Sequence, residues 1–166
     1  MYPIPEHLIP ILTMMDPTKD WEKASIARWT ILLVEDATTI KYLPMGILDG
    51  AETARILRLF PEKAAEGEIN WECLHGDEWV WLLAAQPQFS VHCDWAKLNG
   101  DQWDRLLRVC PQFGEYCDWK KLCGWDWSCL LRMQPQFHIH CDWEKLPDDA
   151  WIGLLEAFPH FAIYKK

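Results

Sequence analysis

Residues 86–146 read QPQFSVHCDWAKLNGDQWDRLLRVCPQFGEYCDWKKLCGWDWSCLLRMQPQFHIHCDWEKL, and this stretch repeats a single motif. The letters Cys-Asp-Trp-x-Lys-Leu occur in it three times, starting at Cys93, Cys117 and Cys141, with a spacing of 24 residues. A fixed period of roughly 20 to 50 residues is typical of repeat proteins, whose units bury their apolar faces against neighbouring units. The stretch therefore predicts a stack of similar units in place of one globular core.

The period extends toward both ends of the chain. Blocks begin at Asp20, Pro44, Asn70, Asp94, Asp118 and Asp142, with spacings of 24, 26, 24, 24 and 24 residues. Ten of the 12 tryptophans fall into two columns, eight residues apart within a block. The first column is Trp21, Trp71, Trp95, Trp119 and Trp143, and the second is Trp29, Trp79, Trp103, Trp127 and Trp151. The Pro44 block has Met45 and Thr53 in these places and counts as a divergent repeat.

Each block predicts one α-helix followed by 3₁₀ turns. In GDQWDRLLRVC (100–110), apolar residues follow the spacing i, i+3, i+4 and i+7 of one helix face. We expect Asp101, and its equivalents Asp77 and Asp149, to cap the helix start. Pro111 disfavours helix in the residue before it, so the helix ends near Val109 or Cys110.

The segment after the helix is too short for a second α-helix. We expect one or two 3₁₀ turns there, with Phe113 and Trp119 pointing inward and Asp118 capping the second turn. In the stack, each tryptophan is expected to pack on the same residue of the next block, as a ladder. The ending HFAIYKK, with Lys165 and Lys166, suits a polar C-terminal cap.

The predicted fold is all-α: a right-handed-type short solenoid of about six 24-residue repeats, each one α-helix plus a 3₁₀ turn. The predicted organisation is a single solenoid domain. It has an N-terminal cap over 1–19, divergent repeats over 20–69, regular repeats over 70–161 and a tail over 162–166.

Over residues 70–161, the period and the order of elements resemble the leucine-rich repeat variant, an α/3₁₀ solenoid. The letters PQF…CDW.KL also look like those of bacterial repeat proteins. These resemblances imply a solenoid fold and a bacterial source, and they imply no activity. No spacing of four cysteines for an iron–sulfur cluster is present in the sequence.

Composition narrows the possible partners. The net charge of -9 argues against direct nucleic-acid binding, which needs a basic surface. No apolar run approaches the roughly 18 residues that span a membrane, and the N-terminus lacks the features of a signal peptide. The seven cysteines are an odd number, which fits reduced thiols in the cytoplasm. We therefore expect a cytoplasmic protein whose partner is another protein.

Residues with catalytic or metal-binding chemistry recur with the repeat. The column Cys93, Cys117 and Cys141 is spread over successive blocks, roughly 10 Å apart, too far to converge on one ion. Asp and Lys also repeat in the CDW.KL motif, as scaffold residues do, whereas a catalytic pair occurs once. Glutamines beside the prolines are expected to satisfy turn backbone groups. The sequence thus predicts no catalytic residue, no metal site, no cofactor and no enzyme activity.

The departures from the repeat point to a binding surface. Trp81 and Trp125, the two tryptophans outside both columns, fall on the predicted outer face of their helices. Exposed Trp and Arg are enriched at binding hot spots. The candidate partner-binding residues are Val80, Trp81, Arg105, Arg108, Trp125 and Arg132. The alternative is that this face packs on an irregular loop, or that each tryptophan lies flat on its own repeat.

Two functions remain open at this point. One is a non-catalytic repeat scaffold that binds another protein through its outer helix face. The other is an acidic inhibitor or decoy that mimics nucleic acid in the basic groove of a target. Binding that weakens steeply with salt favours the decoy. Self-association of two copies is also compatible with the pattern.

Overall fold

The computed structural model describes residues 45, 48–65 and 69–165. The predicted N-terminal cap over 1–19 and the first block, from Asp20, lie outside the described residues. The chain divides into two compact units, Met1–Cys73 and Leu74–Lys166, and each is considered by itself.

The described residues are all helical, with no strand among them. Five α-helices of 10 residues each recur with the predicted period: α3 (Gly50–Leu59), α4 (Gly76–Ala85), α5 (Gly100–Val109), α6 (Gly124–Met133) and α7 (Asp148–Ala157). The prediction that the helix stops near Val109 or Cys110, before Pro111, is confirmed, since α5 ends at Val109. The fold class predicted from the sequence, a short solenoid of helix-plus-turn units, is therefore correct.

The connections between α-helices are 3₁₀ helices, also as predicted. The first unit contains η5 (Pro61–Ala65) and η6 (Trp71–Cys73). The second unit alternates six-residue and three-residue segments: η7 (Pro87–His92), η8 (Trp95–Lys97), η9 (Pro111–Tyr116), η10 (Trp119–Lys121), η11 (Pro135–His140), η12 (Trp143–Lys145) and η13 (Pro159–Tyr164). Since η13 has the length of η11 and the same Pro, Phe and Ile positions, the last repeat runs on to Tyr164.

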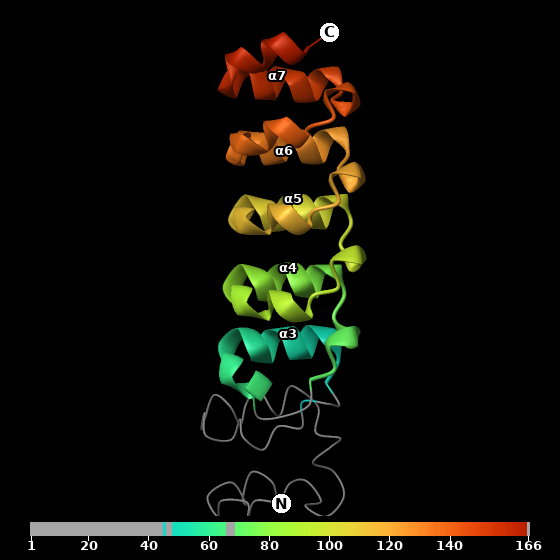
Figure 1. The fold of residues 1–166 in the computed structure, drawn as a ribbon, viewed down its shortest axis with the longest axis vertical. Coiled ribbons are helices and arrows are strands. Elements are labelled where there is room, and N and C mark those ends of the chain that lie inside the picture. The colour runs from blue at the N-terminus through green and yellow to red at the C-terminus, as the bar shows by residue number, and fades with distance from the viewer. Residues whose placement is uncertain (1–44, 46–47, 66–68, 166) are drawn as a thin grey trace, which may run out of the picture. The chain divides into compact units, whose positions relative to one another are not determined.

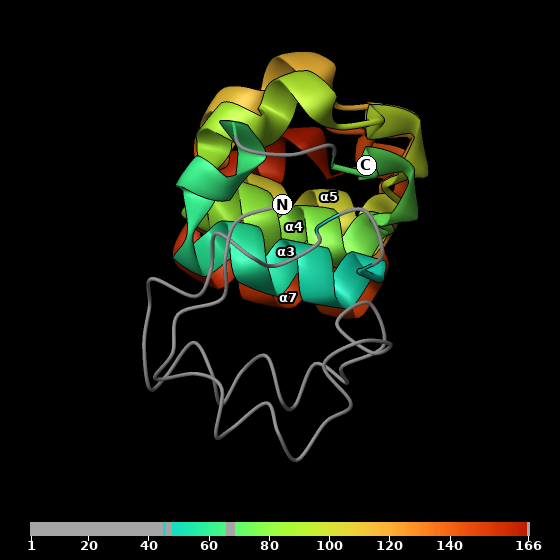
Figure 2. The ribbon, with the colours of Figure 1, turned by 90° about the horizontal axis from the view of Figure 1, so that it is seen from below.

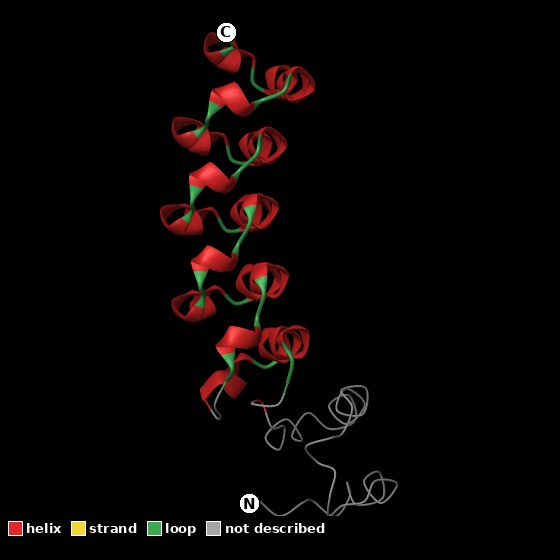
Figure 3. Ribbon diagram, turned by 90° about the vertical axis from the view of Figure 1, so that its right-hand side faces the viewer, coloured by secondary structure: helices red, strands yellow, loops and turns green. Residues whose placement is uncertain are grey.

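Within the second unit the α-helices stack in chain order, α4 on α5, α5 on α6 and α6 on α7 (Figure 1). Viewed along the stack, α4, α5 and α7 lie over one another on one side (Figure 2). The side view shows the α-helices forming one column and the 3₁₀ helices filling the other side of each layer (Figure 3). One face of the second unit is thus made by α-helices and the opposite face by 3₁₀ helices.

The predicted N-caps are wrong by two residues. Asp77, Asp101 and Asp149 are the second residues of their helices, and the residues before the helices are His75, Asn99 and Pro147. Asn99 forms a capping box with Gln102: Gln102 N donates to Asn99 Oδ1, and Asn99 N donates to Gln102 Oε1, both at 3.0 Å.

The helices α5 and α6 begin with glycine because the next block comes too close for a side chain. A Cβ on Gly100 would collide with the carbonyl oxygen of Lys121, and a Cβ on Gly124 with that of Lys145. These carbonyls belong to the three-residue turns that precede the following helices. The glycines therefore set how closely successive layers approach at the helix starts.

The helix tryptophans form the core of the second unit. Trp79, Trp103, Trp127 and Trp151 are each at most 4% exposed, and Phe89, Phe113, Phe137 and Phe161 are buried opposite them. Phe113 points inward as predicted, whereas Trp119 is only half-buried. Burying a large aromatic contributes about 3–5 kcal/mol, judged from large-to-alanine substitutions, so this column dominates the stability of the stack.

The predicted tryptophan ladder is wrong in its pairing. Trp119 stacks on Trp127 at 5.5 Å between ring centroids and on His140 at 4.5 Å, and it contacts Phe137 at 5.1 Å. Trp95 and Trp143 repeat this arrangement, with Tyr116 and Tyr164 in the place of His140. Each turn tryptophan thus lies between the helix tryptophan that follows it and an aromatic ring of the next six-residue 3₁₀ helix. The turn tryptophan and the helix tryptophan of the same block therefore pair with each other.

The lysines of the CDW.KL motif bond to the backbone of the preceding turn. Lys121 Nζ donates to the carbonyl oxygens of Ala96 and Leu98 at 2.9 and 2.8 Å. Lys145 Nζ does the same with Lys120 and Leu122, at 2.9 and 3.2 Å. The lysines therefore link successive blocks by charge-assisted hydrogen bonds.

In the first unit, the divergent repeat replaces the buried tryptophan with a small polar residue. Thr53 is 0% exposed, and its Oγ1 lies 3.9 Å from Cys73 Sγ. Asp49 caps α3, since Glu52 N donates to Asp49 Oδ1 at 2.8 Å. The helix itself is thus preserved although the tryptophan is lost.

Candidate protein-binding surface

The ten-residue helices of the second unit expose the same helical positions, numbered here from one to ten. Positions two, six and nine of α4–α7 form what we call the outer helix face. Its members are Asp77, Trp81, Ala84, Asp101, Arg105, Arg108, Trp125, Cys129, Arg132, Asp149, Gly153 and Glu156. This face points away from the 3₁₀ helices, because the buried positions four, seven and eight lie on the opposite side of each helix.

Trp81 and Trp125 lie on this face and are exposed. Their exposed fractions are 57% for Trp81 and 56% for Trp125, against 0% for Trp103 in the core. No ring contact or side-chain hydrogen bond ties either indole to another described residue. The structure thus favours the exposed interpretation over a face covered by a loop.

Val80, included in the predicted surface, is buried. It occupies the fifth helical position and is 5% exposed, like Asp104 at 4% and Ser128 at 6%. This position faces the following helix: Ser128 Oγ donates to the Ala150 carbonyl of α7 at 3.2 Å. Val80 therefore belongs to the packing between helices and is removed from the candidate surface.

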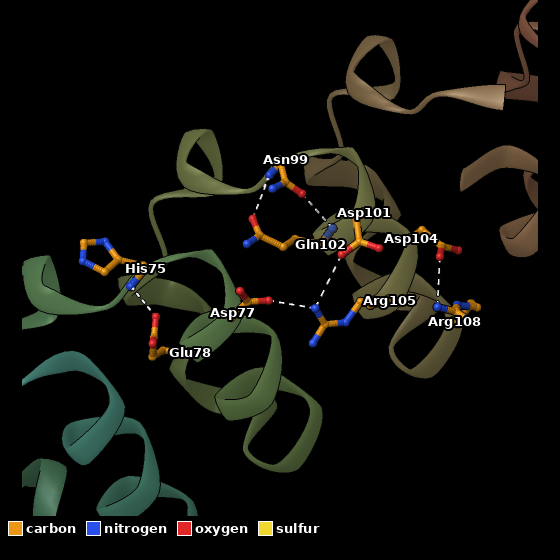
Figure 4. Close-up of polar contacts among 9 residues, drawn as sticks. All are labelled: His75, Asp77, Glu78, Asn99, Asp101, Gln102, Asp104, Arg105 and Arg108. Atoms are coloured by element: carbon orange, nitrogen blue, oxygen red, sulfur yellow. Dashed lines mark hydrogen bonds and ion pairs between the residues drawn. The ribbon is translucent and has the colours of Figure 1, made fainter. Parts of the chain in front are cut away.

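Arg105 lies at the centre of a charged cluster that joins α4 and α5. Its Nη1 lies 2.7 Å from Asp77 Oδ1 and 3.5 Å from Asp101 Oδ2 (Figure 4). The guanidinium is about one-third exposed, so these ion pairs fix its direction more than they stabilise the fold. Trp81 and Trp125 lie on α4 and α6, one on each side of the helix that carries this cluster.

Arg108 and Arg132 occupy the ninth position of successive helices but differ in their partners. Arg108 Nη2 lies 2.9 Å from Asp104 Oδ2, and Asp104 is buried (Figure 4). Burial raises the pKa of Asp104 to about 6, an effect that Arg108 opposes. Arg132 is exposed, and no ion pair within the described residues holds it. Arg132 thus offers the unpaired cation of the outer helix face.

The recurring cysteines are poorly suited to reaction. Burial raises the pKa of the thiols of Cys93, Cys117 and Cys141 to about 12, and the aspartate beside each adds to the shift. A thiol with such a pKa carries almost no thiolate at neutral pH. Within residues 45, 48–65 and 69–165, no three His, Cys, Asp or Glu side chains are grouped to hold a metal ion.

The predicted roles of the turn polar residues are confirmed in part. Asp118 Oδ1 accepts from Lys120 N at 3.3 Å, the expected turn cap. Gln134 Nε2 donates to the carbonyl of Arg108 in the preceding helix at 2.9 Å, which is a backbone group but not one of its own turn. Gln136 Nε2 donates to the Gln134 side chain at 2.8 Å, not to backbone.

Sequence reasoning missed a second exposed apolar column, on the 3₁₀ face. Val91, Ile139 and Ile163 occupy the fifth position of η7, η11 and η13 and are 81%, 72% and 80% exposed. Glu115 takes this position in η9. The signal was present in the sequence, since these residues fall on the 24-residue period, two places after the Phe column, in three of its four positions.

These features define the class of the protein: an all-helical repeat protein whose second unit is a solenoid with two exposed faces. Comparison of the chain with protein families, with characterised proteins and with solved structures finds no match. The described part of the chain contains no helix with the length and hydropathy needed to cross a bilayer.

Proposed function

We propose that the protein is a non-catalytic scaffold that binds another protein through the outer helix face, with Trp81 and Trp125 as its anchors. The observation that carries this proposal is the exposure of these two indoles, while the helix-column tryptophans of the same unit are buried. Tryptophan supplies large, rigid contact area and is enriched at interface hot spots.

The chemistry of the remaining residues supports a non-catalytic role. The ammonium groups of Lys121 and Lys145 donate hydrogen bonds to backbone carbonyls, and the recurring thiols have pKa values of about 12. Arg105 is oriented by Asp77 and Asp101, which leaves Arg132 to meet an acidic group of the partner.

The test compares three baits in extracts of the source cells: the native chain, the Trp81→Ala/Trp125→Ala double variant, and Ile139→Ala. Ile139 is a matched control because it is an exposed apolar residue on the opposite face. We expect one partner to be retained by the native chain and by Ile139→Ala and lost by the double variant. Retention by the double variant, with melting temperatures unchanged, overturns the proposal.

Salt separates this function from the acidic decoy. An interface centred on two indoles keeps most of its affinity as ionic strength rises, because burial of apolar area is not screened. A decoy that occupies a basic groove loses affinity steeply over the same range. Titrating the captured complex at increasing salt distinguishes the two.

A further inference from the structure

The edge of α7 exposes residues that every other helix of the second unit buries. At the fifth helical position, Val80, Asp104 and Ser128 are 4–6% exposed, whereas Ile152 is 58% exposed. At the eighth position, Leu83, Leu107 and Leu131 are 0% exposed, whereas Leu155 is only half-buried. Ile152 and Leu155 lie three residues apart and share one face, so they form an apolar stripe. This stripe continues the helix-on-helix surface that joins α4 to α5, α5 to α6 and α6 to α7.

The start of α7 differs from the other helices in a way that limits what can cover the stripe. Where α5 and α6 begin with Gly100 and Gly124, α7 begins with Asp148. The turn of a following block approaches those glycines so closely that a Cβ would strike its carbonyl oxygen. Asp148 has both a Cβ and a carboxylate, so another block of this kind cannot seat on α7 in the same register. A helix without such a turn ahead of it meets no such obstacle.

The stripe is bordered by negative charge. Asp148 and Asp149 lie four and three residues before Ile152, and Glu156 lies four residues after it; all three are exposed. Among the described residues, the one ion pair there joins Lys165 Nζ to Asp148 Oδ1 at 3.5 Å, which leaves Asp149 and Glu156 without such a pair. A second copy of this chain would bring the same carboxylates to the contact, and these would repel one another. Charge therefore favours a basic binding partner over a second copy.

From these observations we propose that the α7 edge, formed by Ile152 and Leu155 with Asp149 and Glu156, binds a basic amphipathic α-helix of a partner protein. The apolar side of that helix covers Ile152 and Leu155 as the next helix covers Val80 and Ser128 inside the stack. Its Lys or Arg residues pair with the flanking carboxylates. The site adjoins the outer helix face, with which it shares Asp149 and Glu156, and it does not depend on Trp81 or Trp125.

The experiment uses the full chain and two labelled synthetic peptides of about 20 residues, long enough to form a helix. One peptide has leucines on one helix face and lysines elsewhere, and the other has glutamates in place of the lysines. Fluorescence anisotropy measures the binding of each peptide to the native chain, to Ile152→Ser and to Ile139→Ser. Both substitutions remove one exposed isoleucine and leave the charge unchanged, so Ile139→Ser is the matched control.

We expect the lysine peptide to bind the native chain and Ile139→Ser equally, and Ile152→Ser about tenfold more weakly through loss of apolar burial. The glutamate peptide should not bind. Equal binding of the lysine peptide to all three proteins would mean charge attraction alone and would overturn the proposal. Sedimentation velocity adds a second check: a native dimer that Ile152→Ser abolishes would assign the edge to a second copy, which also overturns it.

Discussion

Two glycine-to-alanine substitutions in neighbouring helices should change stability in opposite directions. Alanine is a better helix former than glycine by about 1 kcal/mol, so helix propensity alone predicts that both Gly124→Ala and Gly153→Ala stabilise the protein. The structure separates them. At Gly153 in α7, the nearest atom to an added Cβ is Arg132 Nη1 at 3.9 Å, an ordinary contact. We therefore expect Gly153→Ala to raise the free energy of unfolding by about 0.5–1 kcal/mol.

At Gly124 the added methyl group has no room. Its Cβ would collide with the carbonyl oxygen of Lys145 and would lie 2.7 Å from Pro147 Cδ. Both obstacles belong to backbone or a proline ring, which cannot turn aside as a flexible side chain can. Overpacking of this kind costs about 1–3 kcal/mol, which exceeds the gain in propensity. We expect Gly124→Ala to lower the free energy of unfolding by about 1–2 kcal/mol.

The assay is equilibrium urea unfolding followed by far-UV circular dichroism at neutral pH, on the native chain and both variants. Gly76→Ala is a useful third variant, because its obstacle is the Gln102 side chain, which can move. It should fall between the other two. If Gly124→Ala is as stable as Gly153→Ala, the layers are not in contact at the helix start, and the explanation of the repeated glycines fails.

Three further predictions concern packing, the lysine links and pH. Trp127→Ala should lower the free energy of unfolding by about 3–5 kcal/mol. Trp125 lies on the same helix but is exposed, so Trp125→Ala should change this free energy by less than about 1 kcal/mol. Equal losses in urea unfolding would show that Trp125 belongs to the core. Lys121→Met should lower the free energy of unfolding by about 1.5–3 kcal/mol, because the hydrogen bonds to two carbonyls are lost. The control Lys120→Met should change the free energy of unfolding by less than about 0.5 kcal/mol. Similar urea midpoints for the two variants would show that Lys121 does not stabilise the contact between blocks. Asp104 has a pKa of about 6 in the folded protein, against about 3.9 in the unfolded chain, so the folded protein binds its proton more tightly. This difference stabilises the fold fully below about pH 4, and the stabilisation is lost as the pH rises through 6. Asp104→Asn should flatten that part of the stability profile, and an unchanged profile would mean that Asp104 does not titrate there.

The period of the sequence was enough to predict the helices, because apolar spacing and proline positions act within one block. The end of α5 at Val109 follows from Pro111 alone. The aspartate role in the turns was also accessible, since Asp118 bonds to backbone two residues away. Most of the fold could therefore be predicted from rules that act within one block.

Part of what failed depended on contacts between blocks. A helical wheel places Val80 beside Trp81 on the polar side, but it does not show that the next helix covers the fifth position. The helix starts were misplaced for a different reason: Asn99 caps α5 through its local capping box with Gln102, and Asp101 was chosen in its place. The choice of Trp81 and Trp125 depended on their departure from the columns and on their place on the outer side of the helical wheel, and their exposure agrees with it.

The contacts between successive blocks have a mechanical consequence. Trp119 packs on Trp127 and His140 of its own block, whereas Lys121 bonds to carbonyls of the previous turn and each α-helix packs on the next, so each layer of the second unit is joined mainly to its immediate neighbours. A force applied to the two ends of such a unit acts on every contact between layers, and the weakest contact should break first while the other layers remain packed. Stretched in this way, the unit should lengthen in steps of about one block, because each block can unfold separately from the others.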